Sequence, residues 1–291
     1  MSSDKKSDKT KVIAALMDWH RHNGRHALAW RHTRDPYRIL VSELMLQQTQ
    51  VARVSVKYEK FLVRFPTLKA LANADRADVL RAWQGLGYNS RAVRLHALAK
   101  AMASTGLPQR REELLKLPGI GPYTAGAMII FAHRKPSLSV DVNVERVLGR
   151  VFWPPTTVPA RKEVDALALD LITKVPAPHH WHAALMDIGS AVCTARKPKC
   201  GLCPLYAYCR TRGTRPETIG RTPKQSKFHG SVRWWRGQIL KLLLAAPVPE
   251  QHLLHRIKEA PDVEEQDRYE AALTALKAEG IVKERRGKLQ V

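Results

Sequence analysis

The sequence of 291 residues contains four cysteines, and all of them fall within one short segment. Cys193, Cys200, Cys203 and Cys209 follow one another with six, two and five intervening residues. Because a disulfide framework would scatter its cysteines to close loops, this clustering indicates a metal site in a reducing compartment. Four thiolates suit either a zinc ion or an iron–sulfur cluster, and the uneven spacing is unlike the paired Cys-x2-Cys knuckles of zinc sites.

A glycine-containing turn lies between two expected helices, the first ending at Lys116 and the second starting near Tyr123. Its residues Pro118-Gly119-Ile120-Gly121 allow a tight turn and a close approach of the backbone to a ligand. The N–H groups at the start of the second helix form an anion site that suits phosphate. The segment resembles the hairpin of a helix-hairpin-helix DNA-binding element, although a plain interhelical turn has the same pattern. We therefore expect Pro118, Gly119 and Gly121 to contact DNA.

Two carboxylates could act as a pair. Asp141 precedes an apolar helix and is expected to cap it, and its place after the hairpin resembles the signature of a superfamily of DNA glycosylases. Glu43 lies in an apolar helical stretch, where a buried carboxylate needs an arginine partner or a chemical task. Cleavage of an N-glycosidic bond provides such a task, since one acid protonates the leaving base and a second carboxylate stabilises the oxocarbenium-like sugar.

Helical periodicity with short connections that carry Pro or Gly dominates the chain before residue 210. Expected helices cover residues 12–19, 42–54, 75–83, 90–102, 123–131, 142–151, 164–175 and 182–192. After a basic linker, helices at 232–244, 249–258 and 268–280 and a terminal hairpin predict a small winged-helix-like α+β module. DNA binding and simple packing are both open as its role.

The formal net charge is +23. The residues before Gly230 contain 38 basic and 17 acidic side chains, a net of +21, whereas the remainder carries 11 and 9, a net of +2. Such an excess favours a nucleic acid partner, and no apolar stretch approaches the ~20 residues of a membrane-spanning helix. With no visible signal peptide, we expect a cytoplasmic, nucleoid-associated protein that does not bind membranes.

From about residue 17 to residue 209, the sequence resembles the adenine DNA glycosylase (MutY) family. The motifs that carry the resemblance are Leu28-Ala29-Trp30-Arg31, Asp35-Pro36-Tyr37, Ser42-Glu43-Leu44-Met45-Leu46-Gln47-Gln48-Thr49-Gln50-Val51, Gly85-Leu86-Gly87-Tyr88, the hairpin with Tyr123-Thr124-Ala125-Gly126, and the cysteine segment. The cysteine spacing is similar to the [4Fe–4S] loop of the endonuclease III and adenine glycosylase branch. The resemblance implies a [4Fe–4S] cluster and an all-α, helix-hairpin-helix DNA glycosylase fold of two helical domains.

The implied organisation has five parts. They are an N-terminal helix that packs with the cluster domain (1–29), a six-helix domain with the helix-hairpin-helix (30–138), the iron–sulfur domain (139–209), a basic linker (210–229) and the winged-helix-like module (230–291).

The resemblance also implies residue roles. Glu43 protonates the adenine and later helps to activate water, and Asp141 stabilises the cationic sugar with support from Tyr123 and Asn143. Five further residues are implied to contact the DNA. Trp30 and Arg31 line the base pocket. Gln48 and Tyr88 enter the duplex beside the lesion, and Leu86 lies near the opposite base. Because related bifunctional enzymes have a lysine nucleophile where this chain has Tyr123, we expect a monofunctional enzyme.

Two departures concern the substrate. Ala183 stands where the family usually has a Gln or Glu that can hydrogen-bond adenine, and His182 beside it could compensate. The short module also replaces the C-terminal domain that reads 8-oxoguanine in many members. We expect a monomeric DNA glycosylase that removes adenine opposite 8-oxoguanine or guanine from mismatched or oxidatively damaged duplex DNA. The alternatives are a thymine or uracil glycosylase acting opposite guanine, and a non-catalytic iron–sulfur DNA-binding regulator.

Overall fold

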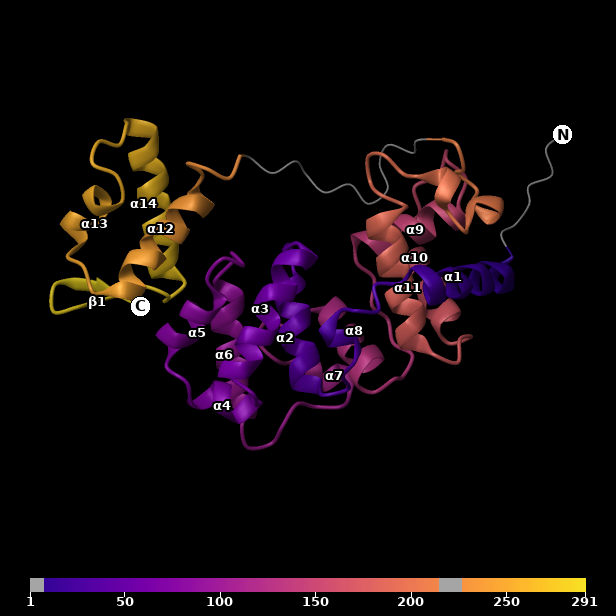
Figure 1. Ribbon diagram of the computed structural model, residues 1–291, viewed down its shortest axis with the longest axis horizontal. Helices are drawn as coiled ribbons and strands as arrows, with labels where there is room; N and C mark the ends of the chain where they lie inside the picture. The colour runs from indigo at the N-terminus through magenta and orange to yellow at the C-terminus, as the bar shows by residue number, and fades with distance from the viewer. Residues whose placement is uncertain (1–7, 215–226) are drawn as a thin grey trace. The chain divides into compact units, whose positions relative to one another are not determined.

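The computed structural model describes residues 8–214 and 227–291, and their regular secondary structure is helical apart from one two-stranded hairpin (Figure 1). Contacts divide the chain into two compact units made of interleaved segments. The first unit comprises Met1–Leu40, Pro108–Lys116 and Ile120–Pro223, and the second comprises Val41–Leu107, Leu117–Gly119 and Lys224–Val291. Within the described parts of the chain, no helix combines the length and apolar character needed to cross a membrane.

The first unit contains the N-terminal helix, the helices around the hairpin and the cysteine loop. Its α-helices are α1 (Lys9–Asn23), α7 (Arg111–Leu114), α8 (Pro122–Ala132), α9 (Val142–Phe152), α10 (Arg161–Ile172) and α11 (Pro178–Ala191). Three short 3-10 segments are η1 (Ala29–Arg31), η2 (Cys200–Leu202) and η3 (Tyr206–Tyr208). The helix α2 (Pro36–Leu46) leads from this unit into the second.

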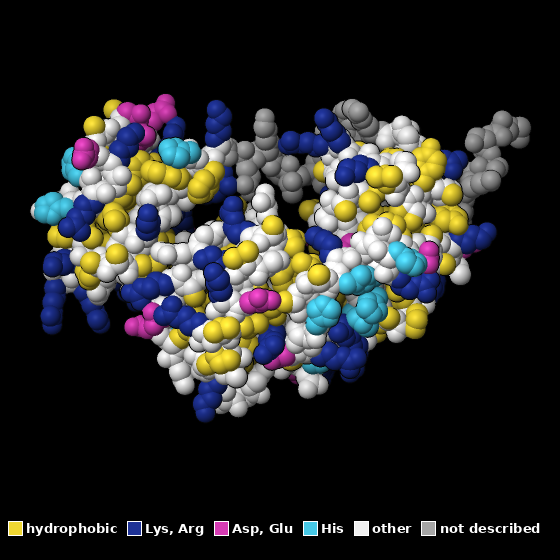
Figure 2. Space-filling model, in the orientation of Figure 1, with side chains coloured by type: hydrophobic (Ala, Val, Ile, Leu, Met, Phe, Trp, Pro, Cys, Tyr) yellow, Lys and Arg dark blue, Asp and Glu magenta, His cyan; other side chains and the backbone are white. Residues whose placement is uncertain are grey.

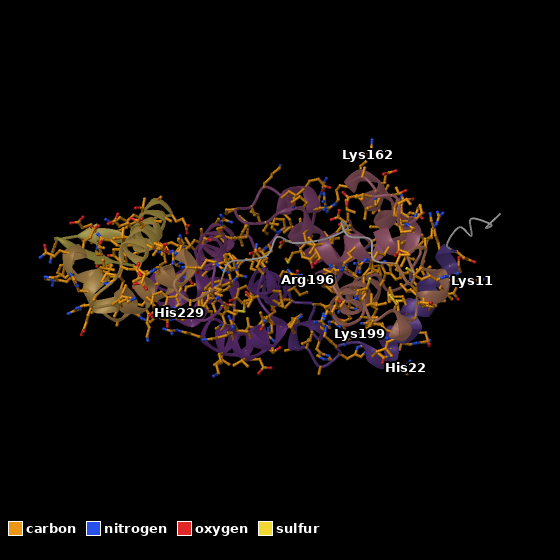
Figure 3. All side chains as sticks on the ribbon, turned by 90° about the horizontal axis from the view of Figure 1, so that it is seen from above. Lys11, His22, Lys162, Arg196, Lys199 and His229 are labelled. Carbon is orange, nitrogen blue, oxygen red and sulfur yellow. The ribbon has the colours of Figure 1, made fainter. Side chains whose placement is uncertain are left out.

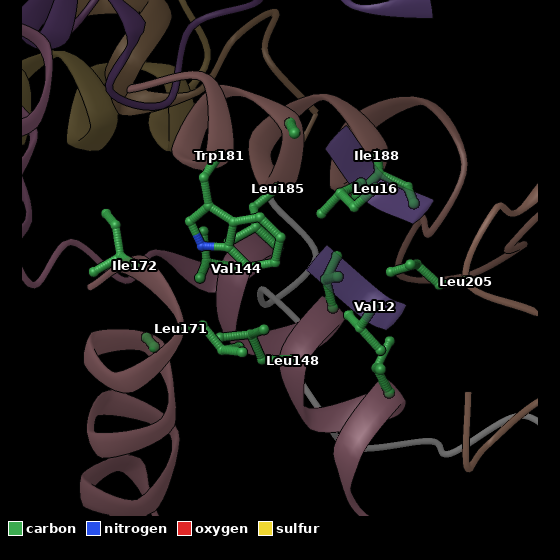
Figure 4. Close-up of a cluster of buried hydrophobic side chains, with 14 of the residues drawn as sticks. Val12, Leu16, Val144, Leu148, Leu171, Ile172, Trp181, Leu185, Ile188 and Leu205 are labelled. Atoms are coloured by element: carbon green, nitrogen blue, oxygen red, sulfur yellow. The ribbon is translucent and has the colours of Figure 1, made fainter. Parts of the chain in front are cut away.

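The core of the first unit joins α1, α9, α10 and α11 to the cysteine loop (Figure 4). Val12 and Leu16 of α1 and Trp181 of α11 are at most 1% exposed there. Leu205, which lies between two of the cysteines, is buried in the same cluster. The hydrophobic effect that assembles these helices therefore also anchors the loop.

The second unit combines a bundle with the C-terminal module. The bundle contains α3 (Val51–Arg64), α4 (Leu68–Asn73), α5 (Arg76–Trp83) and α6 (Ser90–Met102). The module contains α12 (Val232–Ala245), α13 (Glu250–Ile257), α14 (Val263–Ala278) and the antiparallel strands β1 (Lys283–Arg285) and β2 (Lys288–Gln290). Arg286 and Gly287 turn the hairpin with φ angles of 51° and 68°, as a two-residue type I′ turn requires.

These elements confirm the expected all-α fold with a small α+β module at the end. One expected helix is wrong, because the stretch 42–54 is broken between Leu46 and Val51, where Gln48 takes a φ of 54°. The last helix also begins earlier than residue 268, because Asp262 caps α14 in a reciprocal pair with Glu265. Residues 215–226 of the expected linker lie outside the described residues.

Candidate active site and cluster loop

Asp141 caps α9 and is held by three hydrogen bonds. Its Oδ1 accepts from the backbone N–H groups of Asn143 at 2.9 Å and Val144 at 2.8 Å. Its Oδ2 accepts from the side-chain Nδ2 of Asn143 at 2.7 Å. These bonds fix the half-buried carboxylate in one orientation, so Asp141 serves as a cap and can also stabilise a neighbouring positive charge without reorganisation.

A hydrogen-bonded chain connects Asp141 with the cysteine loop. Arg146, which is 3% exposed, donates from Nη2 to Asn143 Oδ1 at 2.7 Å and from Nε to the carbonyl oxygen of Cys193 at 2.7 Å. Arg146 Nη2 also donates to the carbonyl oxygen of Gly189 at 2.7 Å. The orientation of Asp141 therefore depends on the position of the first cysteine through Asn143 and Arg146.

The four cysteines are unpaired by disulfides and line one common cavity, together with the apolar residues Val147, Ile188 and Leu205. In the described residues, no three His, Cys, Asp or Glu side chains converge closely enough to hold a single metal ion. Thiols distributed around one cavity fit a polynuclear cluster, which takes one thiolate at each iron. Burial raises the pKa of Cys203 to about 12, so a bound cation is needed to hold this sulfur as a thiolate.

The cluster loop is also tied to α9 and has a basic surface. Arg150 Nη1 lies 3.4 Å from Cys193 Sγ and donates to the carbonyl oxygen of Thr194 at 2.8 Å. Arg196 and Lys199, which Figure 3 labels, are exposed on the loop. Lys and Arg side chains are also spread over the face of the molecule shown in Figure 2, where acidic side chains are fewer.

The hairpin leads directly into α8. Pro118, Gly119 and Gly121 are exposed, and Gly119 takes a φ of 82°, which favours glycine. Pro122 opens α8, and the next residue, Tyr123, is half-buried. The exposed residues Pro118, Gly119 and Gly121 come directly before the first-turn N–H groups of this 11-residue helix. The predicted phosphate contact requires such exposure.

The segment of Trp30 and Arg31 is fixed by a buried aspartate of α11. Arg31 donates from Nη1 and Nη2 to the two carboxylate oxygens of Asp187, each at 2.6 Å. Arg25 donates to the same carboxylate from Nε at 2.6 Å and from its backbone N at 2.9 Å. Asp187 is 1% exposed, and Trp30 is buried beside Arg31 in η1. The ion pair with Asp187 thus orients the guanidinium of Arg31, and burial holds the neighbouring Trp30.

Glu43 belongs to the second unit and lies on α2. Its exposed fraction is 6%, and its neighbours Leu44 and Met45 are at most 2% exposed. A carboxylate buried to this extent in an apolar helix requires a polar partner or a chemical task.

Gln48 and Tyr88 are presented by two loops of the second unit that share one anchor. Both residues take left-handed backbone conformations, with φ angles of 54° and 48°. The buried guanidinium of Arg91 donates from Nη1 to the carbonyl oxygen of Leu44 at 2.7 Å and from Nη2 to that of Gly87 at 2.9 Å. Further Arg91 bonds reach the carbonyl oxygens of Met45, Gln47 and Leu86 and the hydroxyl of Thr49. The many hydrogen bonds of Arg91 hold both loops in place, and this allows strained backbone to persist at a functional site.

The position expected to read adenine contains no polar side chain. Ala183 is 4% exposed and packed in the first unit. Its neighbour His182 is 2% exposed, and its ring centre lies 6.1 Å from that of Tyr123. Among the described residues, none forms a hydrogen bond with His182 Nε2. Burial lowers the pKa of His182 to about 4, so its imidazole is neutral at physiological pH.

Comparison with known proteins identifies the family. Residues 41–174 match the family described as HhH-GPD superfamily base excision DNA repair protein, and residues 193–209 match the iron-sulfur binding domain of endonuclease III. An adenine DNA glycosylase of Mycolicibacterium smegmatis is 39% identical over 92% of this chain and 92% of its own length. The chain belongs to the adenine DNA glycosylase family. The human adenine DNA glycosylase is 38% identical over 70% of this chain, which corresponds to 40% of the human protein.

Two solved structures extend the comparison. A thermostable thymine-DNA glycosylase is 29% identical, with a TM-score of 0.63 over 69% of this chain and 94% of that protein. An endonuclease III bound non-covalently to DNA is 23% identical with a TM-score of 0.56 over 70% of this chain, which confirms the fold alone. As a member of the adenine DNA glycosylase family, the protein is a DNA-binding N-glycosylase of base excision repair, and its four cysteines hold a [4Fe–4S] cluster.

Sequence reasoning missed the residues that orient the predicted ones. Arg91, Arg146 and Asp187 are at most 5% exposed, and each makes several polar contacts with backbone or side chains. A charged residue inside an apolar helix is the signal that could have found them, because such a residue is buried only when it is paired.

Proposed function

We propose that this glycosylase excises adenine opposite 8-oxoguanine or guanine from duplex DNA without cleaving the strand. The observation that carries the proposal is the carboxylate of Asp141, held by three N–H donors in a chain that is 39% identical to an adenine DNA glycosylase over 92% of its length. An anion fixed in this way stabilises the positive charge that develops on the deoxyribose as the base departs.

The remaining residues supply the rest of the reaction. Glu43 donates a proton to a ring nitrogen of adenine, and the bond between the base and the sugar then breaks with its electron pair leaving on the base. Water adds to the sugar carbon and returns a proton to Glu43, so the acid is regenerated. Extrusion of the nucleotide, with Gln48 and Tyr88 entering the duplex, exposes the sugar to this attack.

Tyr123 makes the enzyme monofunctional. A phenol forms no Schiff base with the sugar aldehyde, whereas an amine at this position would. Borohydride treatment of the enzyme with an abasic duplex is therefore expected to trap no covalent complex. Efficient trapping would show that a lysine elsewhere in the chain provides lyase chemistry.

Thymine opposite guanine is the second candidate substrate. It is favoured by the 29% identity to a thermostable thymine-DNA glycosylase over 94% of that chain, and by the apolar, buried Ala183 where adenine would be hydrogen-bonded. A single-turnover assay tests both substrates on duplexes that place adenine, thymine or uracil opposite guanine or 8-oxoguanine. Release of adenine supports the proposal, and release of thymine without adenine overturns it.

A further inference from the structure

A groove lies in the second unit between α12 of the C-terminal module and the two loops that carry Gln48 and Tyr88. Its volume is about 830 Å³. From the bundle, the lining includes residues 48–50 and 84–90; from the module, it includes Arg233, Trp234, Gly237, Gln238 and Lys241. The residues expected to enter the duplex therefore share a cavity with a module that has no assigned role.

The contact between α12 and the bundle is specific. Arg81 of α5 donates from Nη2 to the carbonyl oxygen of Leu244, near the end of α12, at 2.9 Å and from Nε to the same oxygen at 3.2 Å. Arg76 Nη2 lies 3.4 Å from the carbonyl oxygen of Ile281. Trp235 and Ile239 of α12 are fully buried in the module, and the polar residues of α12 line the groove together with Leu240 and Leu244.

The chemistry of the lining matches a nucleic acid strand. Four cations, Arg53, Arg233, Arg236 and Lys241, line the groove with one acid, Glu279, which accepts a hydrogen bond from Arg236 at 2.7 Å. Three aromatic side chains line it as well, namely Tyr88, Trp234 and Phe228, of which Tyr88 is 37% and Phe228 61% exposed. Cations for phosphates combined with aromatic faces for bases are the features of a site for unpaired nucleotides.

From this combination we infer that the groove binds a DNA strand at the lesion, with phosphates on Arg233 and Lys241 and one unstacked base on Trp234. The C-terminal module thereby takes part in binding damaged DNA, at a surface continuous with the loops of Gln48 and Tyr88. This inference rests on the proposed function for the origin of the unpaired base, since extrusion of one nucleotide unstacks its neighbours and leaves its partner base unpaired.

The test measures binding of the full-length, cluster-loaded protein to a duplex with a tetrahydrofuran abasic site opposite 8-oxoguanine, which cannot be turned over. We expect Trp234→Ala to raise Kd about tenfold for this duplex and much less for an undamaged one, since stacking contributes to binding only where a base is unpaired. Arg233→Ala/Lys241→Ala should reduce the slope of log K against log salt by about 2. Because Trp234 contacts Trp235, the surface substitution Lys241→Glu provides a second probe that spares the module's core.

The matched controls remove the same charge from the module outside the groove. Arg256 and Lys283 are exposed and do not line it, so Arg256→Ala/Lys283→Ala and Arg256→Glu should leave Kd and the salt slope unchanged. 2-Aminopurine placed opposite the abasic site or next to it reports which strand meets Trp234, as a fluorescence change that Trp234→Ala abolishes.

Unchanged binding in the folded groove variants, or equal losses in the controls, would overturn the inference. These outcomes differ from a failure of the proposed function, which would appear as a wild-type protein that releases no adenine. The abasic duplex would still reveal whether the groove binds DNA in that case.

Discussion

Replacement of Asp187 by asparagine removes the charge that holds Arg25 and Arg31 in the first unit. The side chain of Asp187 is 1% exposed, that of Arg31 14% and that of Arg25 33%. Asparagine keeps the shape but presents an NH2 group to a guanidinium, so two donors face each other and two cations lose their counter-ion. Breaking a buried ion pair costs about 3–5 kcal/mol. Because Arg25 is partly exposed, we expect Asp187→Asn to lower the free energy of unfolding by about 3 kcal/mol, the lower end of this range. At about 2–4 °C per kcal/mol for a unit of this size, Tm should fall by about 6–12 °C.

Asp170 provides the matched control. It also contacts two cations, with Nζ of Lys9 and of Lys174 each 2.7 Å from the carboxylate, but its side chain is 37% exposed. Asp170→Asn should therefore cost at most about 1 kcal/mol. Thermal unfolding followed by circular dichroism compares the two variants, and glycosylase activity should fall only in Asp187→Asn, because Arg31 loses its orientation. Equal Tm shifts for the two variants would refute the assignment of Asp187 as the buried anchor.

Three further predictions follow from buried cations and histidines. Arg146→Lys should lose the link between Asn143 Oδ1 and the carbonyl oxygen of Cys193, because one ammonium group cannot bind both. The amount of iron bound per chain should therefore fall. A variant with full iron content and full activity would contradict the role of this link. Arg91→Lys should destabilise the protein by about 3 kcal/mol, since the carbonyl oxygens that Arg91 binds lose hydrogen-bond partners. The variant should also lose more affinity for lesion duplexes than for undamaged ones. Equal losses of affinity on both duplexes would argue against the role of Arg91 in holding the two loops. Burial lowers the pKa values of His20 and His182 to about 4, so both are neutral when folded but take up protons in the unfolded chain below pH ~6.5. The free energy of unfolding should therefore fall as pH drops from ~6.5 towards 4, by about 1.4 kcal/mol per pH unit for each histidine. His182→Gln should reduce this pH dependence, as measured by denaturant unfolding. An unchanged pH dependence would contradict a neutral His182 in the folded protein.

Features that depend on neighbours in the sequence could be predicted. The capping by Asp141 uses N–H groups two and three residues ahead, so it follows from one local pattern. The cysteine ligands lie within one segment of 17 residues, from Cys193 to Cys209, so their clustering indicated a metal site, and the resemblance to the glycosylase family then implied an iron–sulfur cluster. The terminal hairpin was also predicted, because its turn is formed by two adjacent residues, Arg286 and Gly287.

Features that depend on distant contacts could not be predicted. Asp187 lies 156 residues from Arg31, and no local pattern joins the two. The helix expected across 42–54 breaks at Gln48 because Arg91, more than 40 residues away, binds the carbonyl oxygens of Leu44 and Gln47. Helical periodicity continues through this break in the sequence, so only the tertiary contact reveals it. The start of α14 is different, because the pair of Asp262 and Glu265 was a local signal that could have been read.

We propose that Glu43 and Asp141 together catalyse the hydrolysis of the bond between adenine and deoxyribose. Its most direct test is a single-turnover reaction on a duplex with adenine opposite 8-oxoguanine, in which the free base is identified by mass for the wild type, Glu43→Gln and Asp141→Asn. We predict that the wild type releases adenine, and that both variants bind the abasic-site duplex like the wild type but release no base. Adenine release by both variants at the wild-type rate, or no adenine release by the wild type, would contradict this mechanism.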